Sequence, residues 1–136
     1  MSFDVFLNFD GDCRQAMEFY AGVFKLEMPG HIMTYDEAPG FQVPDEAKNR
    51  ILYSTLPIFG CNVMFSDCPP GQHYVKGTNI ALTLGTNDAT EIERLYNALK
   101  EGGVVNMELG KTFFSELYAM VTDKFGITWQ LSKSPI

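Results

Sequence analysis

The sequence predicts an α+β protein made of two tandem βαβββ modules. Three observations support this prediction. The chain of 136 residues has the length of one domain or of two small modules that share a core. The sequence twice indicates a strand followed by a capped helix. Each half also ends in a similar sequence segment, "LYSTLPIFGCNVMFS" in the first and "LYAMVTDKFGITWQLS" in the second. We therefore expect one structural unit to be used twice.

The first module begins with a strand and a helix. Residues 3–9 are apolar and aromatic with polar interruptions, and "DGD" at 10–12 breaks this pattern. Asp12 is placed to cap the following helix, and Gln15 stands three residues further on, as in a weak capping box. The predicted buried face of this helix, at helical spacing, consists of Ala16, Phe19, Tyr20, Val23 and Phe24.

The second module repeats this arrangement. Residues 78–84, "TNIALTL", predict a strand, and "GTND" breaks it. Asp88 and Glu91 have capping-box spacing, and Gly102 with Gly103 ends the helix. The apolar face of this second helix consists of Ile92, Leu95, Tyr96 and Leu99. One offset along the chain superposes both the caps and the apolar faces of the two helices.

Three strand-like runs follow each helix. They cover residues 30–35, 51–58 and 61–66 in the first half, and 104–109, 117–122 and 128–132 in the second. We therefore place the first module at 1–68, a connector rich in Pro and Gly at 69–76, and the second module at 77–136. The first module alone carries a long polar insert, 36–49, of the kind that often covers a binding site.

The composition indicates a soluble globular protein. Hydrophobic residues make up 46% and charged residues 20% of the chain, and no run approaches the ~20 apolar residues that span a bilayer. A net charge of −7 opposes binding to nucleic acid, which needs clustered Lys and Arg. The N-terminal segment has no basic stretch before an apolar block, so we expect a cytoplasmic protein without a secretory signal.

The cysteines and histidines predict no metal centre or disulfide framework. Cys13, Cys61 and Cys68 form no CxxC pair. We expect buried or half-buried thiols, with Cys68 the most exposed because it precedes two prolines. His31 and His73 are expected to be solvated. Neither a GxSxG motif nor a P-loop is present.

Five segments of this chain follow the order of a known family. They are "LNFDGDCRQAMEFYAGVF" at 7–24, "ILYSTLPIFGCNVMFSD" at 51–67, "GTNIALTL" at 77–84, "LKEGGVVNMEL" at 99–109 and "DKFGITWQL" at 123–131. Together they resemble the vicinal oxygen chelate superfamily of glyoxalases, bleomycin-resistance proteins and dioxygenases, and most of all its PhnB-like branch. The resemblance implies that each module forms a half-open barrel around a cavity, and that two chains pair as a homodimer.

Metal-dependent members of this superfamily hold their ion with four ligands, usually two His and two Glu, on the first and last strands of each module. The resemblance places these positions on Asn79 and Gln130 and, within one residue, near Val5 and Met64. These side chains suit a divalent ion poorly. The branch has also carried a ubiquinone-methyltransferase label, but no Gly-rich loop stands between a strand and a helix here. We therefore expect neither a metal nor another cofactor.

The predicted ligand-binding residues are Asn79, Gln130, Tyr53, Trp129 and Phe114. The two amides can donate and accept hydrogen bonds toward a small molecule, or they can satisfy one another in the core. Tyr53 stands where PhnB-like relatives often have His, the side chain best suited to proton transfer near neutral pH. The two remaining aromatic residues can either stack on a ligand or pack in the core.

Three functions remain open at this point. The favoured one is binding of a small molecule without a metal, with no catalytic residue identified. The second is a metal-dependent lyase, isomerase or dioxygenase-like enzyme that uses Glu108, Glu116 or His31 as unusual ligands. The third is a structural or interaction dimer with a filled core. Asp123 is expected to hold the turn before the last strand.

Overall fold

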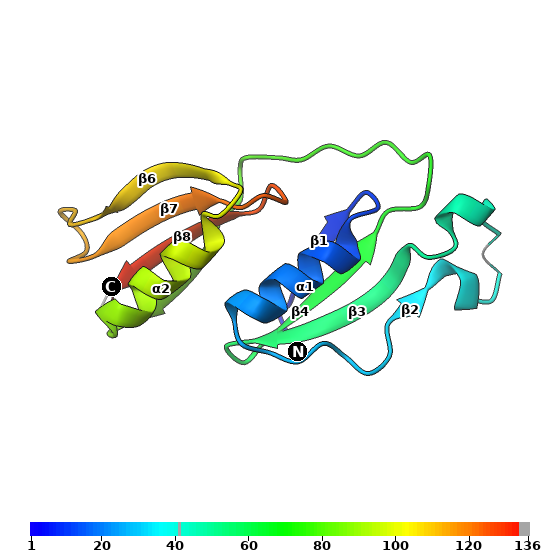
Figure 1. The fold of residues 1–136 in the computed structure, drawn as a ribbon, viewed down its shortest axis with the longest axis horizontal. Coiled ribbons are helices and arrows are strands. Elements are labelled where there is room, and N and C mark those ends of the chain that lie inside the picture. The colour runs from blue at the N-terminus through cyan, green and yellow to red at the C-terminus, as the bar shows by residue number, and fades with distance from the viewer. Residues whose placement is uncertain (41, 134–136) are drawn as a thin grey trace. The chain divides into compact units, whose positions relative to one another are not determined.

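A computed structural model describes residues 1–40 and 42–133 (Figure 1). Residue 41 of the predicted insert and residues 134–136 of the predicted second module lie outside the described residues. The chain divides into two compact units, Met1–Val75 and Lys76–Ile136. The first contains β1 (Val5–Phe9), α1 (Cys13–Val23), β2 (Met33–Thr34), two 3₁₀ turns (Tyr35–Glu37 and Asp45–Ala47), β3 (Ile51–Ile58) and β4 (Cys61–Asp67). The second contains β5 (Leu82–Thr86), α2 (Ala89–Leu99), β6 (Val104–Gly110), β7 (Tyr118–Thr122) and β8 (Thr128–Lys133).

The two units share one sheet topology. Their strand orders are β1-β4-β3-β2 and β5-β8-β7-β6. In each unit the first and last strands run parallel, and the other neighbours run antiparallel. The predicted α+β class with a repeated βαβββ order is therefore confirmed. Each sheet is mixed and open, and neither closes into a barrel.

The strand predictions differ in accuracy. β3 covers the predicted residues 51–58, whereas the strand predicted at 78–84 is wrong and lies at Leu82–Thr86. Leu82 pairs with Trp129, the second residue of β8. Residues 78–80 therefore extend beyond the start of β8 and have no neighbouring strand to pair with. The run predicted at 30–35 contains only the two residues of β2 before a 3₁₀ turn begins.

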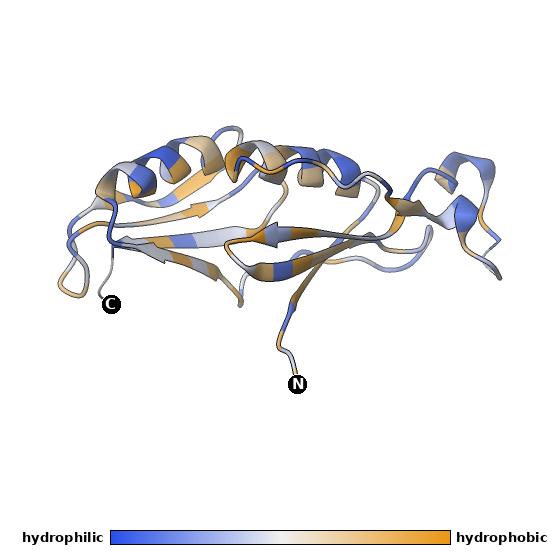
Figure 2. Cartoon of the chain, turned by 90° about the horizontal axis from the view of Figure 1, so that it is seen from below, coloured by the Kyte–Doolittle hydropathy of each residue, from blue (hydrophilic) through white to orange (hydrophobic). Residues whose placement is uncertain are grey.

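In each unit the helix lies on one side of its sheet (Figure 2). The buried apolar residues of β1, β3, β4, β7 and β8 lie mostly on the side of the sheet that faces the helix, because successive side chains of a strand point to opposite faces. In the first unit they include Leu7, Phe9, Leu56, Val63 and Phe65, which pack with Ala16, Met17 and Tyr20 of α1. In the second unit they include Val121, Trp129 and Leu131, with Ile92, Leu95 and Leu99 of α2. We call the other side of each sheet its open face. Neither helix, at 11 residues each, could cross a membrane.

A carboxylate from β4 caps α1. Asp12 is the N-cap residue as predicted, but its side chain makes no capping hydrogen bond, so the predicted role of that side chain is wrong. Instead, Asp67 Oδ1 accepts from the backbone N–H groups of Gly11 (2.7 Å) and Cys13 (3.0 Å), and Oδ2 accepts from Ile51 N–H (2.9 Å). Asp67 is 1% exposed. One buried carboxylate thus joins the start of α1, the start of β3 and the end of β4.

The second unit uses two acidic residues for its local geometry. Asp88 caps α2 as predicted, accepting from the N–H groups of Thr90 (3.0 Å) and Glu91 (3.3 Å). Asp123 holds the turn before β8, also as predicted, because its Oδ1 accepts from Phe125 N–H (2.8 Å) and Ile127 N–H (3.1 Å). These bonds are local in sequence, which is why capping-box spacing and turn preference identified them.

We expect Asp67→Asn to destabilise the protein by about 2–4 kcal/mol, because it removes a charged acceptor and turns an amide N–H₂ toward backbone donors. The matched control is Asp12→Asn, which removes a carboxylate that makes no capping bond and should change the free energy of unfolding by less than about 0.5 kcal/mol. Urea unfolding monitored by circular dichroism measures both. Equal destabilisation by the two substitutions would contradict the assignment of the cap to Asp67.

Candidate functional site

Three partly exposed side chains gather on the open face of the first sheet. Phe6 of β1 is in register with Met64 of β4, and Tyr53 of β3 lies on the same face. The Phe6 and Tyr53 ring centroids are 6.3 Å apart, and these residues are 44% and 43% exposed. We call Phe6, Tyr53 and Met64 the open-face cluster. Sequence reasoning selected Tyr53 but missed Phe6. Because side chains alternate along a strand, Phe6 points to the same face of the sheet as Asn8 and to the opposite face from Leu7.

The structure separates two residues that were predicted to line one pocket. Gln130 is half-buried on the open face of the second sheet, in register with Thr83 and Met120. Trp129 faces the helix, is 2% exposed, and donates from Nε1 to Asp123 Oδ2 at 2.8 Å. These neighbours therefore point to opposite sides of β8. Its position makes Trp129 part of the core rather than of the open face.

The other two predicted residues of the second unit lie outside its strands. Asn79 is exposed in the segment before β5. Phe114, 48% exposed, lies between β6 and β7 with its ring centroid 4.9 Å from that of Tyr118. It borders a shallow pocket of about 290 Å³ with Lys111, Phe113, Glu116 and Lys133. The structure therefore does not gather the four predicted residues of this unit at one site.

The side chains offered as unusual metal ligands have other neighbours. Glu116 forms an ion pair with Lys133 (2.8 Å), whose ammonium group lowers the pKa of that carboxyl below its usual value. His31 Nε2 lies 2.9 Å from a carboxylate oxygen of Glu37. Glu108 is exposed on the edge strand β6. Within residues 1–40 and 42–133, no three His, Cys, Asp or Glu side chains come together as a metal site.

The strand registers also correct the positions of the superfamily's metal ligands. Val5 shares the helix-facing side with Leu7 and Phe9, so the open-face position of β1 is Phe6. On β5 the open-face residue beside Gln130 is Thr83, not Asn79. The four positions thus carry Phe6, Met64, Thr83 and Gln130. A phenyl ring, a thioether, a hydroxyl and an amide do not fit the divalent ion that metal-dependent members use.

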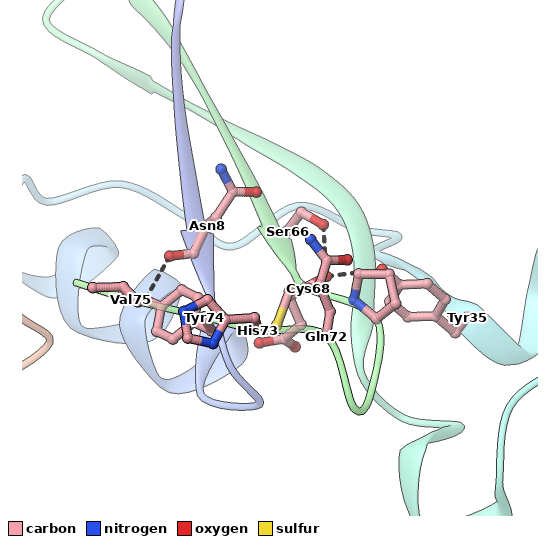
Figure 3. Close-up of a pocket in the computed structure, with 10 residues that line it drawn as sticks. Asn8, Tyr35, Ser66, Cys68, Gln72, His73, Tyr74 and Val75 are labelled. Atoms are coloured by element: carbon pink, nitrogen blue, oxygen red, sulfur yellow. Dashed lines mark hydrogen bonds between the residues drawn. The ribbon is translucent and has the colours of Figure 1, made fainter. Parts of the chain in front are cut away.

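A pocket of about 360 Å³ lies at the end of the first sheet (Figure 3). The ends of β1 and β4 form one side of it through Asn8 and Ser66, and residues 68–75 form another. Tyr74 Oη donates to the Asn8 carbonyl at 2.9 Å, so this segment is held against β1. Sequence reasoning treated 69–76 only as a connector. The signal it passed over was three consecutive hydrogen-bonding side chains, "QHY" at 72–74, between Pro and Gly residues.

An ion pair lies beside Cys68, one of the residues that line this pocket. Arg50 Nη1 donates to Asp10 Oδ1 (2.9 Å) and to the Cys68 carbonyl (3.0 Å), and Cys68 Sγ lies 3.4 Å from Asp10 Oδ1. The hydrogen bond from Arg50, aided by that from Cys68, lowers the pKa of Asp10. Burial raises the pKa of the Cys68 thiol, and its bond to Asp10 raises it further.

The prediction that Cys68 is the most exposed cysteine is wrong. Cys68 is buried, and its backbone N–H donates to Phe9 O at 2.7 Å, which extends the pairing of β4 with β1 by one residue. Cys13 is also buried, at the start of α1. Burial raises the pKa of the Cys13 thiol, and the neighbouring Asp67 carboxylate adds to this shift. Cys61, at the start of β4, is half-buried and is the most accessible of the three.

Comparison with known proteins assigns this fold and sheet geometry to a family. Residues 2–132 match the model of the family described as 3-demethylubiquinone-9 3-methyltransferase. The chain belongs to this family. Protein PA1353 from Pseudomonas aeruginosa, a solved structure, is 30% identical and has a TM-score of 0.87 over 98% of both chains. A second solved structure, from Bacillus cereus, is described as a putative 3-demethylubiquinone-9 3-methyltransferase, PhnB protein. It is 26% identical with a TM-score of 0.82, covering 98% of this chain and 100% of that chain.

The wider resemblance is also confirmed at the level of fold. The family's architecture recurs in a glyoxalase/bleomycin resistance protein/dioxygenase from Alicyclobacillus acidocaldarius. That structure is 14% identical with a TM-score of 0.59, covering 100% of this chain and 92% of that one. The PhnB-like branch and the glyoxalase-type fold predicted from the five sequence segments are therefore both supported.

We expect Cys61 to react first with a thiol reagent such as 5,5′-dithiobis(2-nitrobenzoate) at pH 8. The raised thiol pKa values of Cys13 and Cys68 reduce their thiolate fractions at this pH, and burial limits access to both. Cys61→Ser should remove the fast phase, while urea should expose the remaining thiols. A fast phase that persists in Cys61→Ser would contradict the burial of Cys68.

We expect the fluorescence of Trp129, the single tryptophan of the chain, to be blue-shifted in the native protein and insensitive to iodide. The reason is that its indole is enclosed between β8 and α2 and is bonded to Asp123. Emission spectra and iodide quenching in buffer and in urea measure this. Strong quenching of the native protein would show that the indole reaches solvent and could meet a ligand.

Proposed function

We propose that this protein binds a small molecule, without a metal, at the open face of its first sheet. The observation that carries the proposal is the open-face cluster, in which two aromatic rings and a thioether lie together on the side of the sheet that α1 does not cover. Apolar and aromatic linings are typical of small-molecule sites, and Met adapts to varied ligand shapes. Contiguous exposed apolar patches mark binding surfaces more often than scattered exposed residues do.

The second sheet offers a polar counterpart. Gln130 stands between Thr83 and Met120 on its open face, half-buried, where an amide can donate to and accept from a ligand. We therefore retain Tyr53 and Gln130 as ligand-binding residues and add Phe6 and Met64. Trp129 is better explained as a core residue. The proposal gives Phe6, Tyr53, Met64 and Gln130 a binding role and names no general acid or base.

Methyl transfer, which the family's description names, finds less support in this chain. A nucleotide-type cofactor is commonly held by a Gly-rich loop between a strand and a helix. Here β1 is joined to α1 by Asp10, Gly11 and Asp12, and β5 is joined to α2 by Asn87 and Asp88. Neither junction is Gly-rich. The metal-dependent alternative also has less support, because the superfamily's ligand positions carry Phe6, Met64, Thr83 and Gln130, whose side chains suit a divalent ion poorly.

Pairing of two chains and a cytoplasmic location stay predictions. One feature that supports pairing is β6, an edge strand with Val104, Val105 and Met107 exposed. Sedimentation equilibrium measures the oligomeric state directly.

A neutral apolar dye, N-phenyl-1-naphthylamine, tests the proposed site. We expect its fluorescence to rise saturably with the native protein, and Phe6→Ala or Tyr53→Ala to weaken its affinity about tenfold, since each removes the apolar area of one ring. Both side chains are partly exposed, so the variants should fold. Phe113→Ala is the matched control, because it truncates a fully exposed phenyl ring in the other unit.

Chelation separates the proposal from the metal-dependent alternative. We expect dye affinity, and the affinity of any metabolite found by thermal-shift screening, to be unchanged by EDTA. Binding that EDTA abolishes and one equivalent of a divalent ion restores would overturn the metal-free proposal. Unchanged dye affinity in both Phe6→Ala and Tyr53→Ala would overturn the location of the site.

A further inference from the structure

We propose that the pocket between β1, β4 and residues 68–75 is a second binding site, which takes a small organic amine in its protonated form. This goes beyond the proposed function, because the pocket lining contains none of Phe6, Tyr53 and Met64. Three features of the first unit carry the proposal: a cavity with fixed walls, acceptors and aromatic rings in its lining, and an excess of negative charge beside it.

The walls are held by hydrogen bonds within the protein. Cys68 N–H donates to Phe9 O, Tyr74 Oη donates to Asn8 O, and Gln72 N–H donates to Pro69 O at 3.2 Å. The volume of about 360 Å³ falls within the ~300–1,000 Å³ of small-molecule sites. The site therefore exists before any ligand binds, and a ligand need not order this segment.

The lining suits the N–H groups of an amine. Asn8 and Gln72 present side-chain amides, and neither amide is hydrogen-bonded to another residue within the described parts of the chain. Their oxygens can accept from an ammonium group. Tyr35 and Tyr74 contribute aromatic rings to the same lining (Figure 3), and such rings attract cations at their faces.

The charges around the pocket favour a cation over an anion. Asp67 is part of the lining, and its carboxylate is held by backbone N–H groups rather than by a basic side chain. The charge of Asp10 is offset by its ion pair with Arg50. The Asp12 side chain makes no capping hydrogen bond at the start of α1. Burial raises the pKa of the Tyr74 hydroxyl, and the negative charge of Asp12 adds to this shift. A negative field of this kind attracts cations and repels anions.

Three probes with one ring and different charges test the proposal: benzylamine, benzyl alcohol and benzoate. At pH 7 we expect saturable binding of benzylamine, weaker binding of benzyl alcohol and none of benzoate. Chemical-shift changes of the backbone amides of Asn8, Gln72 and Tyr74 locate the site, and isothermal titration gives the affinity. Benzoate binding as tightly as benzylamine, or none of the three probes shifting these amides, would overturn the proposal.

Substitutions separate this site from the open-face cluster. Tyr74→Ala should weaken benzylamine about fivefold by removing both a ring and the bond that holds the pocket wall to Asn8 O. Asp12→Asn should weaken it about twofold by removing a charge without removing a capping bond. Tyr53→Ala is the control and should leave benzylamine affinity unchanged, while Gln72→Ala should leave the dye N-phenyl-1-naphthylamine unaffected. If Tyr53→Ala weakens benzylamine as much as Tyr74→Ala does, the amine binds at the open-face cluster and the second site is refuted.

Discussion

The first unit depends on the satisfaction of one buried charge. A carboxylate that is almost fully removed from water is costly unless its oxygens are hydrogen-bonded, and Asp67 meets this requirement with backbone donors at the starts of α1 and β3. Its own carbonyl accepts from Tyr35 Oη and Ser66 Oγ, both at 2.9 Å, which ties the start of the 3₁₀ turn Tyr35–Glu37 to the same point. A shift of any one of these segments would leave charge or donors unpaired. The positions of β4 and of the neighbouring pocket wall are therefore fixed by the hydrogen bonds that the buried Asp67 carboxylate requires.

The second unit repeats the architecture with a different anchor. In register, β1 pairs Phe9 with Asp67, whereas β5 pairs Thr86 with Lys133. The buried carboxylate of the second unit is instead Asp123, in the turn before β8, where it bonds Trp129. The two modules thus share strand order and helix position while their polar interiors differ. At the register position that Asp67 occupies in β4, β8 carries Lys133, which lines the pocket of about 290 Å³, so one repeated fold offers two kinds of surface.

Sequence reasoning succeeded where the decisive interactions are local. The cap of α2 at Asp88 and the Asp123 turn use donors within a few residues, and β3 lies between clear turn signals. It failed where a distant segment decides. The start of β5 depends on where β8 begins, and the cap of α1 comes from Asp67, which is 54 residues away from Cys13.

The candidate site was harder to predict for the same reason. The sheet class was evident from the sequence, but the face to which each residue points requires the strand register. This is why Gln130 and Trp129 were grouped together although they point to opposite sides of β8, and why Phe6 was overlooked. All three cysteines belong to the first unit, and the single tryptophan belongs to the second. Each module consequently carries its own intrinsic reporter, so thiol labelling and indole emission, followed together during denaturation, reveal whether the duplicated halves unfold as one cooperative body or in succession.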